Sequence, residues 1–441
     1  MDPWPGGEPA GSVERSSGGL IGNVQLSSSS ADTRIRAGSH LPHLAVALTT
    51  AMILTASLWP GSGAARPEPT PTDGGGALQL ADLLRNAIGY VPLGACLAWS
   101  RRSAPSAVLL GSLLSAAVEL AQHWIPGRIP NLVDWISNTA GTAIGVFLHR
   151  AAPAWGSPSP AYARRLAIGA SAVATAILAG TGILLAPAPT DATYFGHHTP
   201  ALGHLASYAG TLLDASLDGV PIPIGRIDDS HRVRAALSGN YTLKATVRAG
   251  QPPNGLAAFV MITDATYHEI LLLGPDREDL VYRFRSLGES LGFEPARVRM
   301  PHALRGVEPG NVLGLRVERS GGDLCIELRG VLECGLGLTL GDGWLLLAPD
   351  ALGLASLHPI LNMAWMAALF LPLGYWGRKN WPSLAGCAVA ATALFAVPAV
   401  TPLLSTPASQ LLAAACGAGL GQVARRHFEA RIGHSRRVEV G

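Results

Sequence analysis

The sequence predicts a mixed fold: a polytopic α-helical membrane protein of about eight spans, with an extracytoplasmic all-β jelly-roll sandwich domain. Charged residues make up only 14% of the 441 residues, against roughly 25% in ordinary soluble domains. Long stretches without charge flank a central region in which short alternating runs replace them. The net charge of +2 gives no electrostatic footprint for nucleic acid, and five cysteines are too few for a disulfide scaffold.

The charge-poor stretches are long enough to cross a membrane, which takes about 20 mostly apolar residues. They cover 41–59, 78–99, 105–124, 132–149, 165–187, 357–376, 382–404 and 407–424. Buried helices of a soluble protein are the alternative, but such helices need amphipathic neighbours to cover them, and the sequence offers none. We therefore expect a transmembrane unit over 41–187 and a second one over 357–424.

Basic residues in alternate loops set the predicted orientation, because such residues favour the cytoplasmic side. They are Arg101, Arg102, Arg150, Arg164, Arg165, Arg378 and Lys379, together with the arginines after 424. We expect both termini in the cytoplasm of a bacterium, as a disordered tail over 1–40 and a basic tail over 425–441. The region 190–356 then lies outside the cytoplasmic membrane. Cleavage of the first span as a signal peptide near 63–65 is the alternative, which the long polar leader disfavours.

The central region 190–356 reads as a β-sandwich, because short alternating runs are bounded by turn residues and no long helix is evident. The expected strands lie within 241–247, 256–263, 268–273, 280–285, 311–318, 324–334 and 343–348. A two-residue turn at Arg329 and Gly330 makes a hairpin that places Cys325 opposite Cys334. This register permits a cross-strand disulfide, and two free buried cysteines are the alternative.

The runs from Tyr241 to Arg248 and from Asp279 to Arg285 resemble the concanavalin-like, or laminin-G-like, jelly rolls. The resemblance implies a sandwich that binds carbohydrate or protein. No pair of carboxylates stands out as a glycosidase couple, so binding is favoured over hydrolysis. Asp264 follows a strand and is expected to be a turn residue, with calcium or sugar binding as the alternative; no other cofactor or metal is expected.

Polar residues inside spans two to four form the candidate ligand-binding cluster, since ionisable groups in a span usually face a protein interior or a wet cavity. Its members are Asp82, Asn86, Glu119, Gln122, Arg128, Asp134 and Asn138. Spacings of three or four residues put the members within each helix on one face. Arg128, in the turn between spans three and four, is expected to pair with carboxylates of the cluster. Arg85 either competes for that role or extends to the membrane surface.

This pattern, with Pro-Gly-Arg between Glu-x-x-Gln and Asp-x-x-x-Asn-x-x-Gly-x-x-x-Gly, resembles the VanZ-like membrane proteins over roughly 41–150. The resemblance implies a bacterial envelope protein linked to glycopeptide (teicoplanin) resistance, without a settled activity. Its signature positions are Glu119, Gln122, Arg128, Asp134 and Asn138.

Three roles remain open for the cluster: recognition of an anionic head group at the outer leaflet, acid–base chemistry, or a polar lock that fixes helix packing. We expect binding of a cell-surface glycan or lipid-linked precursor rather than catalysis. A membrane enzyme acting on a lipid-linked substrate, and an anchor that displays a lectin-like domain, are the alternatives.

The last three spans repeat part of the first unit. Pro-Leu-Gly374 matches Pro-Leu-Gly94, and Gly417 and Gly421 match Gly141 and Gly145. Gly141 and Gly145 follow the small-xxx-small pattern of closely packed membrane helices. Because Gln410 and Ala414 stand where Asp134 and Asn138 would be, the second copy is expected to keep the packing glycines and lose the polar cluster.

Overall fold

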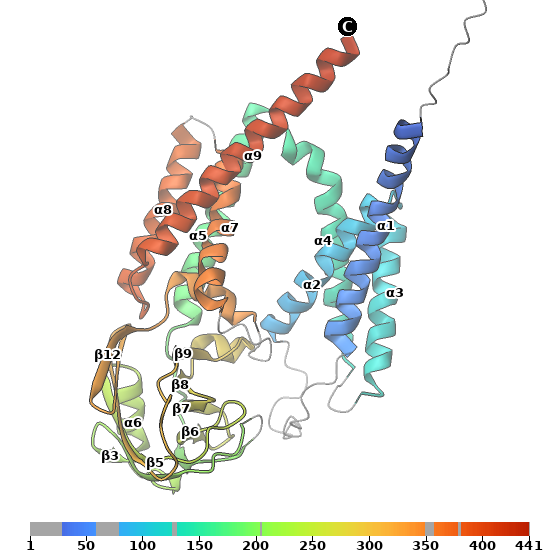
Figure 1. Ribbon diagram of the computed structural model, residues 1–441. Helices are drawn as coiled ribbons and strands as arrows, with labels where there is room; N and C mark the ends of the chain where they lie inside the picture. Colours follow the sequence, from blue (N-terminus) through green and yellow to red (C-terminus); the bar gives the residue numbers. More distant parts are fainter. Residues whose placement is uncertain are drawn as a thin grey trace, which may run out of the picture.

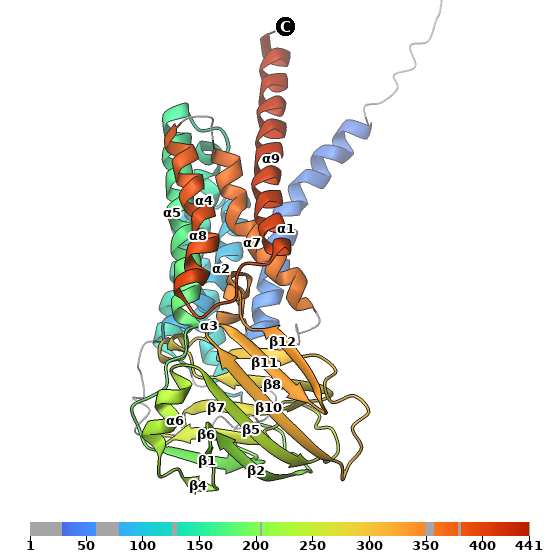
Figure 2. The same cartoon turned by 90° about the vertical axis from the view of Figure 1, so that its left-hand side faces the viewer.

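The computed structural model describes residues 29–58, 79–125, 130–202, 205–348, 357–377 and 381–440. Two groups of helices stand on one side of a β-sandwich (Figures 1 and 2). The first group contains α1 (Ser29–Leu58), α2 (Leu80–Trp99), α3 (Ala104–Gln122) and α4 (Leu132–Gly156). The second contains α5 (Pro160–Leu184), α7 (His358–Trp376), α8 (Trp381–Val400) and α9 (Ala408–Val440).

Each predicted span coincides with one of these helices. Helix α1 begins within the stretch predicted to be a tail, and α9 continues through the basic residues that follow the last predicted span. Among the described residues, four helices are long and apolar enough to cross a membrane: His40–Leu58, Ala104–Gln122, Pro160–Leu184 and Ser383–Val400. These belong to α1, α3, α5 and α8, whereas α2 packs tightly against α4 and α7 packs tightly against α9.

Glycines bring α2 and α4 into backbone contact. A Cβ atom added to Gly141 would lie 2.1 Å from the carbonyl oxygen of Ala87, and one added to Gly145 would lie 2.1 Å from that of Val91. On the other helix, a Cβ atom at Gly94 would lie 2.1 Å from the Thr142 carbonyl oxygen. No side chain fits at these positions, so the spacing that predicted close packing has the expected outcome.

The same line of glycine contacts, called a glycine seam below, recurs between α7 and α9. Added Cβ atoms at Gly417, Gly421 and Gly374 would lie 2.1, 2.2 and 1.8 Å from the carbonyl oxygens of Ala367, Leu371 and Ala418. Every contact has its counterpart in the α2–α4 pair, with residue numbers shifted by 280 from α2 to α7 and by 276 from α4 to α9. The two helix pairs are therefore structural repeats, with Asn362 at the position of Asp82 and Gln410 at that of Asp134.

The sandwich consists of two six-stranded antiparallel sheets. One has the order β4-β1-β6-β7-β8-β9 and the other β12-β11-β10-β5-β2-β3. The strands of the first are β1 (Tyr194–His198), β4 (Gly225–Arg226), β6 (Val260–Asp264), β7 (Glu269–Asp276), β8 (Asp279–Phe284) and β9 (Ala296–Met300). Those of the second are β2 (Thr211–Leu217), β3 (Val220–Pro221), β5 (Tyr241–Arg248), β10 (Val312–Ser320), β11 (Asp323–Leu328) and β12 (Val331–Leu336).

Alternation along the strands builds the core. In β5, Tyr241, Leu243, Ala245 and Val247 are buried and their neighbours point away, as the pattern predicted. Strand β8 differs, because nearly all of its residues are buried; its Arg283, which is 4% exposed, forms an ion pair with Glu269 at 3.0 Å. A short helix that the pattern did not predict, α6 (Ser230–Leu237), also contributes Val233 and Leu237 to the core.

The strand expected over 343–348 is absent, and this prediction was wrong. These residues instead belong largely to η2 (Leu340–Leu346), a 3₁₀ helix. A capping box starts it: Asp342 accepts hydrogen bonds from the backbone nitrogen and the hydroxyl of Thr339, at 2.6 and 2.7 Å. By composition, the apolar run Trp344–Leu347 fits either a strand or a 3₁₀ helix. The capping box of Thr339 and Asp342 favours the helix.

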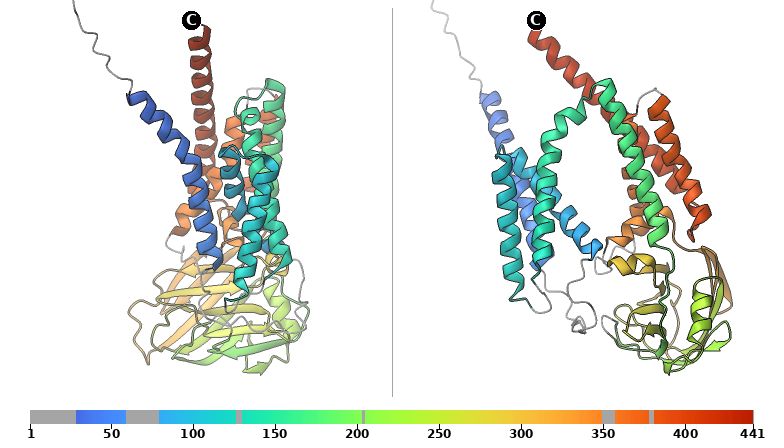
Figure 3. Two further views of the ribbon diagram at one scale, coloured as in Figure 1. Left: turned by 90° about the vertical axis from the view of Figure 1, so that its right-hand side faces the viewer. Right: turned by 180° about the vertical axis from the view of Figure 1, so that it is seen from behind.

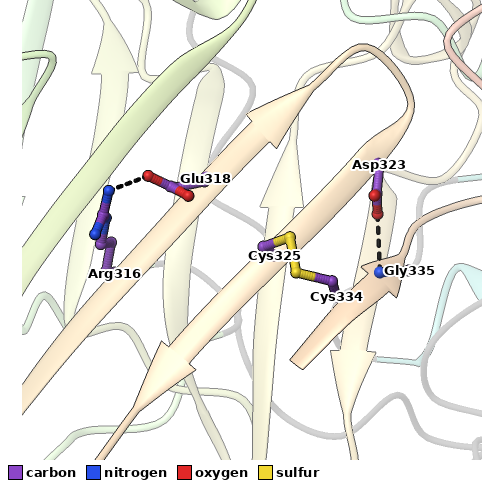
Figure 4. Close-up of a disulfide and its surroundings, with 6 residues drawn as sticks. All are labelled: Arg316, Glu318, Asp323, Cys325, Cys334 and Gly335. Atoms are coloured by element: carbon purple, nitrogen blue, oxygen red, sulfur yellow. Dashed lines mark hydrogen bonds and ion pairs between the residues drawn. A yellow bond between two sulfur atoms is a disulfide. The ribbon is translucent and has the colours of Figure 1, made fainter. Parts of the chain in front are cut away.

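The β11–β12 hairpin turns at Arg329 and Gly330, whose positive φ angles of 56° and 77° are those of a tight hairpin turn. Leu328 pairs with Val331, as the register required. Cys325 and Cys334 form a disulfide across the hairpin, with their Cα atoms 4.0 Å apart (Figure 4). The Asp323 carboxylate accepts a hydrogen bond from the backbone of Gly335 nearby, at 2.9 Å.

A second short 3₁₀ helix, η1 (Leu287–Leu291), gives a pH-dependent prediction. Burial raises the pKa of Glu289 to about 7 from 4.5, although its hydrogen bond with the Ser286 backbone nitrogen opposes this shift. The folded carboxyl therefore keeps its proton at a higher pH than the unfolded chain does. Stability falls as the pH rises from 4.5 to about 7, by up to about 3 kcal/mol.

The variant Glu289→Gln keeps an acceptor for the Ser286 backbone and removes the titration. Its stability relative to the wild type should be unchanged near pH 4 and should rise by up to about 3 kcal/mol at pH 8. Thermal unfolding of both proteins across this range measures the difference. An offset between them that does not change with pH would contradict the assignment.

Candidate functional site

The polar cluster lies where α3 ends and α4 begins, at the end of these helices that points toward the sandwich (Figure 1). Asn131 caps α4 by accepting a hydrogen bond from the backbone nitrogen of Val133 at 3.0 Å. The Glu119 carboxylate, only 9% exposed, accepts a hydrogen bond from the backbone nitrogen of Asn131 at 2.9 Å. Glu119 thus ties the end of α3 to the beginning of α4.

Two amides complete the buried part of this cluster. Gln122 donates to the carbonyl oxygen of Ser57 on α1 at 3.1 Å, and Asn138 donates to the hydroxyl of Ser115 on α3 at 2.9 Å. The amide oxygen of Asn138 is buried and accepts no hydrogen bond from the described residues. The Tyr90 side chain of α2, 4% exposed, lies close to Ser115. Unused hydrogen-bonding capacity is therefore present between α2, α3 and α4.

Not all predicted members lie together. Within the described chain, no hydrogen bond or ion pair joins Asp82 or Asn86 to α3 or α4. Asp82 instead pairs with Arg85, one turn further along α2, at 3.2 Å. Asp134 lies in the first turn of α4, where its backbone carbonyl accepts a hydrogen bond from Ser137 at 3.0 Å. Arg128 lies outside the described residues, so its pairing remains a prediction.

Arg85 pairs with Asp82, one carboxylate of the predicted cluster, and also reaches residues far along the chain. Its guanidinium donates to the Glu294 carboxylate at 2.9 Å and to the carbonyl oxygens of Leu346 and Leu347 at 3.3 and 3.2 Å. These carbonyls end η2, where a cation is electrostatically favoured. Arg85 therefore fastens α2 to the connecting segments of the sandwich. Local sequence pattern does not predict this contact, because the partners of Arg85 are more than two hundred residues away.

A second polar cluster surrounds the other end of η2. Asp342, only 2% exposed, accepts hydrogen bonds from the Asn362 amide at 2.9 Å and from the His358 ring at 2.7 Å. Asn362 in turn accepts from the Trp344 indole at 2.7 Å. Gln410 accepts from the backbone nitrogen of Gly341 at 3.0 Å and donates to Thr339 at 2.7 Å.

The second repeat has therefore kept a polar cluster, contrary to the prediction that it was lost. Asn362 and Gln410 stand at the positions of the acids Asp82 and Asp134, and η2 supplies the acid, Asp342. An acid supplied from outside the repeat leaves no trace in the repeat's own sequence. As a result, η2 lies between the two helix groups: its beginning is bonded to α7 and α9 and its end to α2.

In the sandwich, Asp264 is the last residue of β6, and its carboxylate holds the turn that follows. Burial opposes its ionisation, but hydrogen bonds from Thr266 and His268 lower its pKa. Its carboxylate accepts from the backbone nitrogens of these two residues at 2.9 and 3.0 Å. Across the described residues, no group of three His, Cys, Asp or Glu side chains is placed to hold a metal ion.

Comparison with known proteins identifies the first helical unit. The family model described as VanZ/LLP1 matches residues 27–153, which span α1 to most of α4. No curated protein and no solved structure matches the chain. The matched segment contains the whole α3–α4 polar cluster. Residues 27–153 therefore form a VanZ-like unit, and together with the apolar helices they indicate a membrane protein.

Proposed function

We propose that this protein binds a lipid-linked phosphate or glycan head group at the outer face of the bacterial cytoplasmic membrane, without catalysing a reaction on it. The observation that carries the proposal is the buried Asn138 amide oxygen, which has no described partner. An unpaired buried acceptor is costly, so a ligand hydroxyl that donates to it gains free energy. Glu119 offers a charged acceptor beside it, and Arg128 remains the predicted donor to the phosphate.

Two features support the outward orientation. The disulfide of Cys325 and Cys334 is typical of an oxidising compartment, which supports a location of the sandwich outside the cytoplasm. The basic residues Arg101, Arg102 and Arg150 lie at helix ends remote from the sandwich, on the side that the positive-inside rule assigns to the cytoplasm. The polar cluster then faces the outer leaflet.

Binding of a polyprenyl phosphate tests the proposal. Native mass spectrometry of the full chain in mild detergent should show tighter binding of the phosphate than of the polyprenol of equal length. Asn138→Leu should weaken binding of a sugar-linked polyprenyl phosphate, whose sugar hydroxyls can donate to the Asn138 amide oxygen, about fivefold to tenfold, the effect of one lost hydrogen bond. Thr139→Val is the matched control and should leave binding unchanged, because its hydroxyl bonds only to the carbonyl of Trp135 on the same helix, at 2.8 Å.

Two results would count against the proposal. Equal affinity for polyprenol and polyprenyl phosphate would contradict recognition of the phosphate group. If Asn138→Leu lowers the unfolding temperature but leaves the affinity for the sugar-linked polyprenyl phosphate unchanged, the cluster is a lock for helix packing and not a binding site.

A second role, display of a carbohydrate-binding domain, is favoured by the docking of η2. Hydrogen bonds from Arg85, Asn362 and Gln410 hold the segment around η2 on both helix groups, as an anchored platform would require. On this reading the sandwich is a concanavalin-like jelly roll that binds glycan. Binding of the full chain to a glycan array, undiminished by Asn138→Leu, would favour display over head-group capture.

A further inference from the structure

Figure 3 shows that α4 ends and α5 begins on the side remote from the sandwich. A groove lies there, lined by residues of α4, α5 and α7. Its volume is about 410 Å³. The lining consists of Trp155, Arg165, Leu166, Gly169, Ala170, Val173, Ala174, Ala368, Leu369, Pro372 and Trp376. Arg165 is the one charged member of this lining.

The groove is a gap in the packing on its α5 side. An added Cβ atom at Gly169 would meet nothing within 4 Å, so the space in front of this glycine is open. From Arg165 to Val173 the helix rises about 12 Å, a distance that suits part of an acyl chain. Because α5 is long and apolar enough to cross a membrane, we expect hydrocarbon to fill this space.

The end of the groove that lies farthest from the sandwich has the features of a membrane–water interface. Trp155 and Trp376 lie edge to face with ring centroids 6.5 Å apart, and indoles of this kind concentrate at head-group level. The Trp376 indole donates to the backbone carbonyl oxygen of Trp155 at 3.0 Å, which holds the Trp376 side chain against the end of α4. Arg165 is exposed and makes no ion pair with any described residue, so its guanidinium is available to an anion at this level.

We propose that this groove binds one anionic phospholipid, with its phosphate on Arg165 and an acyl chain along Gly169 toward Val173. Charge complementarity selects the lipid, because a guanidinium forms charge-assisted hydrogen bonds with phosphate and prefers an anionic to a zwitterionic surface. This site lies in the second helix group and does not depend on the Asn138 cluster.

The test compares phosphatidylglycerol with phosphatidylcholine of identical acyl chains, added to the delipidated full chain and counted by native mass spectrometry. The wild type should prefer phosphatidylglycerol about fivefold, the effect expected of one basic residue near the surface. Arg165→Gln should abolish this preference, whereas Arg164→Gln should retain it, because Arg164 is exposed on the same helix but does not line the groove.

A matched glycine pair tests the acyl-chain part. Gly169→Leu should fill the groove and remove the tightly bound lipid, and Gly180→Leu should have no effect. Gly180 lies on the same helix, also with nothing within 4 Å of an added Cβ atom, but outside the groove. Loss of lipid in both variants, or in neither, would overturn the proposal. So would a change of oligomeric state in Gly169→Leu with unchanged lipid binding, because a second copy would then occupy the groove.

Discussion

Replacing Gly374 with alanine is expected to destabilise the α7–α9 pair by at least about 3 kcal/mol, the upper range for overpacking. The added Cβ atom would lie 1.8 Å from the backbone carbonyl oxygen of Ala418, which no side-chain rotation can relieve. The two helices must move apart along the whole seam. Because Gly417 and Gly421 depend on the same separation, the loss spreads beyond one contact.

Gly419→Ala is the matched control, since an added Cβ atom there would meet nothing within 4 Å. Alanine has the higher helix propensity, so this variant should gain up to about 1 kcal/mol. Thermal unfolding of the detergent-purified proteins distinguishes the two. The same comparison holds in the first repeat between Gly94→Ala and Gly89→Ala. Equal unfolding temperatures within each pair would mean that the glycine seams do not hold the helices together.

Replacing Asp342 with leucine is expected to cost about 3–5 kcal/mol, as breaking a buried charged network does. Its carboxylate accepts hydrogen bonds from Thr339, Asn362 and His358, and all of these donors would be left without their acceptor. The loss should release η2 from α7. Limited proteolysis should then cut between the sandwich and α7 at lower protease concentration than in the wild type.

Asp323→Leu controls for loss of a carboxylate that receives a backbone hydrogen bond. Asp323 accepts from Gly335 at 2.9 Å on an exposed hairpin, and its removal should cost only about 1 kcal/mol. A similar small loss for Asp342→Leu, with unchanged proteolysis, would contradict the role of η2 as the contact between the sandwich and the helices.

The sequence was sufficient for features that depend on local pattern. Stretches without charged residues predicted the positions of the helices, and the Gly-x-x-x-Gly spacing predicted the glycine contacts of both helix pairs. Alternation of apolar and polar residues predicted β5 and its buried face. The two-residue turn at Arg329 and Gly330 gave the register of its hairpin. Each of these signals lies within one element or between two neighbours in the chain.

Contacts between distant segments were the part that pattern did not reveal. Arg85 donates hydrogen bonds to Glu294 and to the end of η2, and Asp342 accepts one from Asn362. In both cases the local sequence does not indicate the partner. Strands β1 and β2 lack a run of alternation that stands out from the loops around them. In the candidate site, Glu119 binds the beginning of α4 and Asn138 binds α3, whereas Asp82 pairs with Arg85 within α2.

Labelling with a maleimide that cannot cross the cytoplasmic membrane tests the orientation on which head-group capture depends. Single reporters are introduced as Ile224→Cys in the sandwich, where Ile224 is 77% exposed, and Ala430→Cys near the end of α9, after Cys96, Cys387 and Cys416 are replaced by alanine. If the sandwich lies outside the cytoplasm and the end of α9 lies inside, residue 224 is labelled in intact cells and residue 430 only after the cells are opened. Labelling at 430 but not at 224 in intact cells would contradict this orientation.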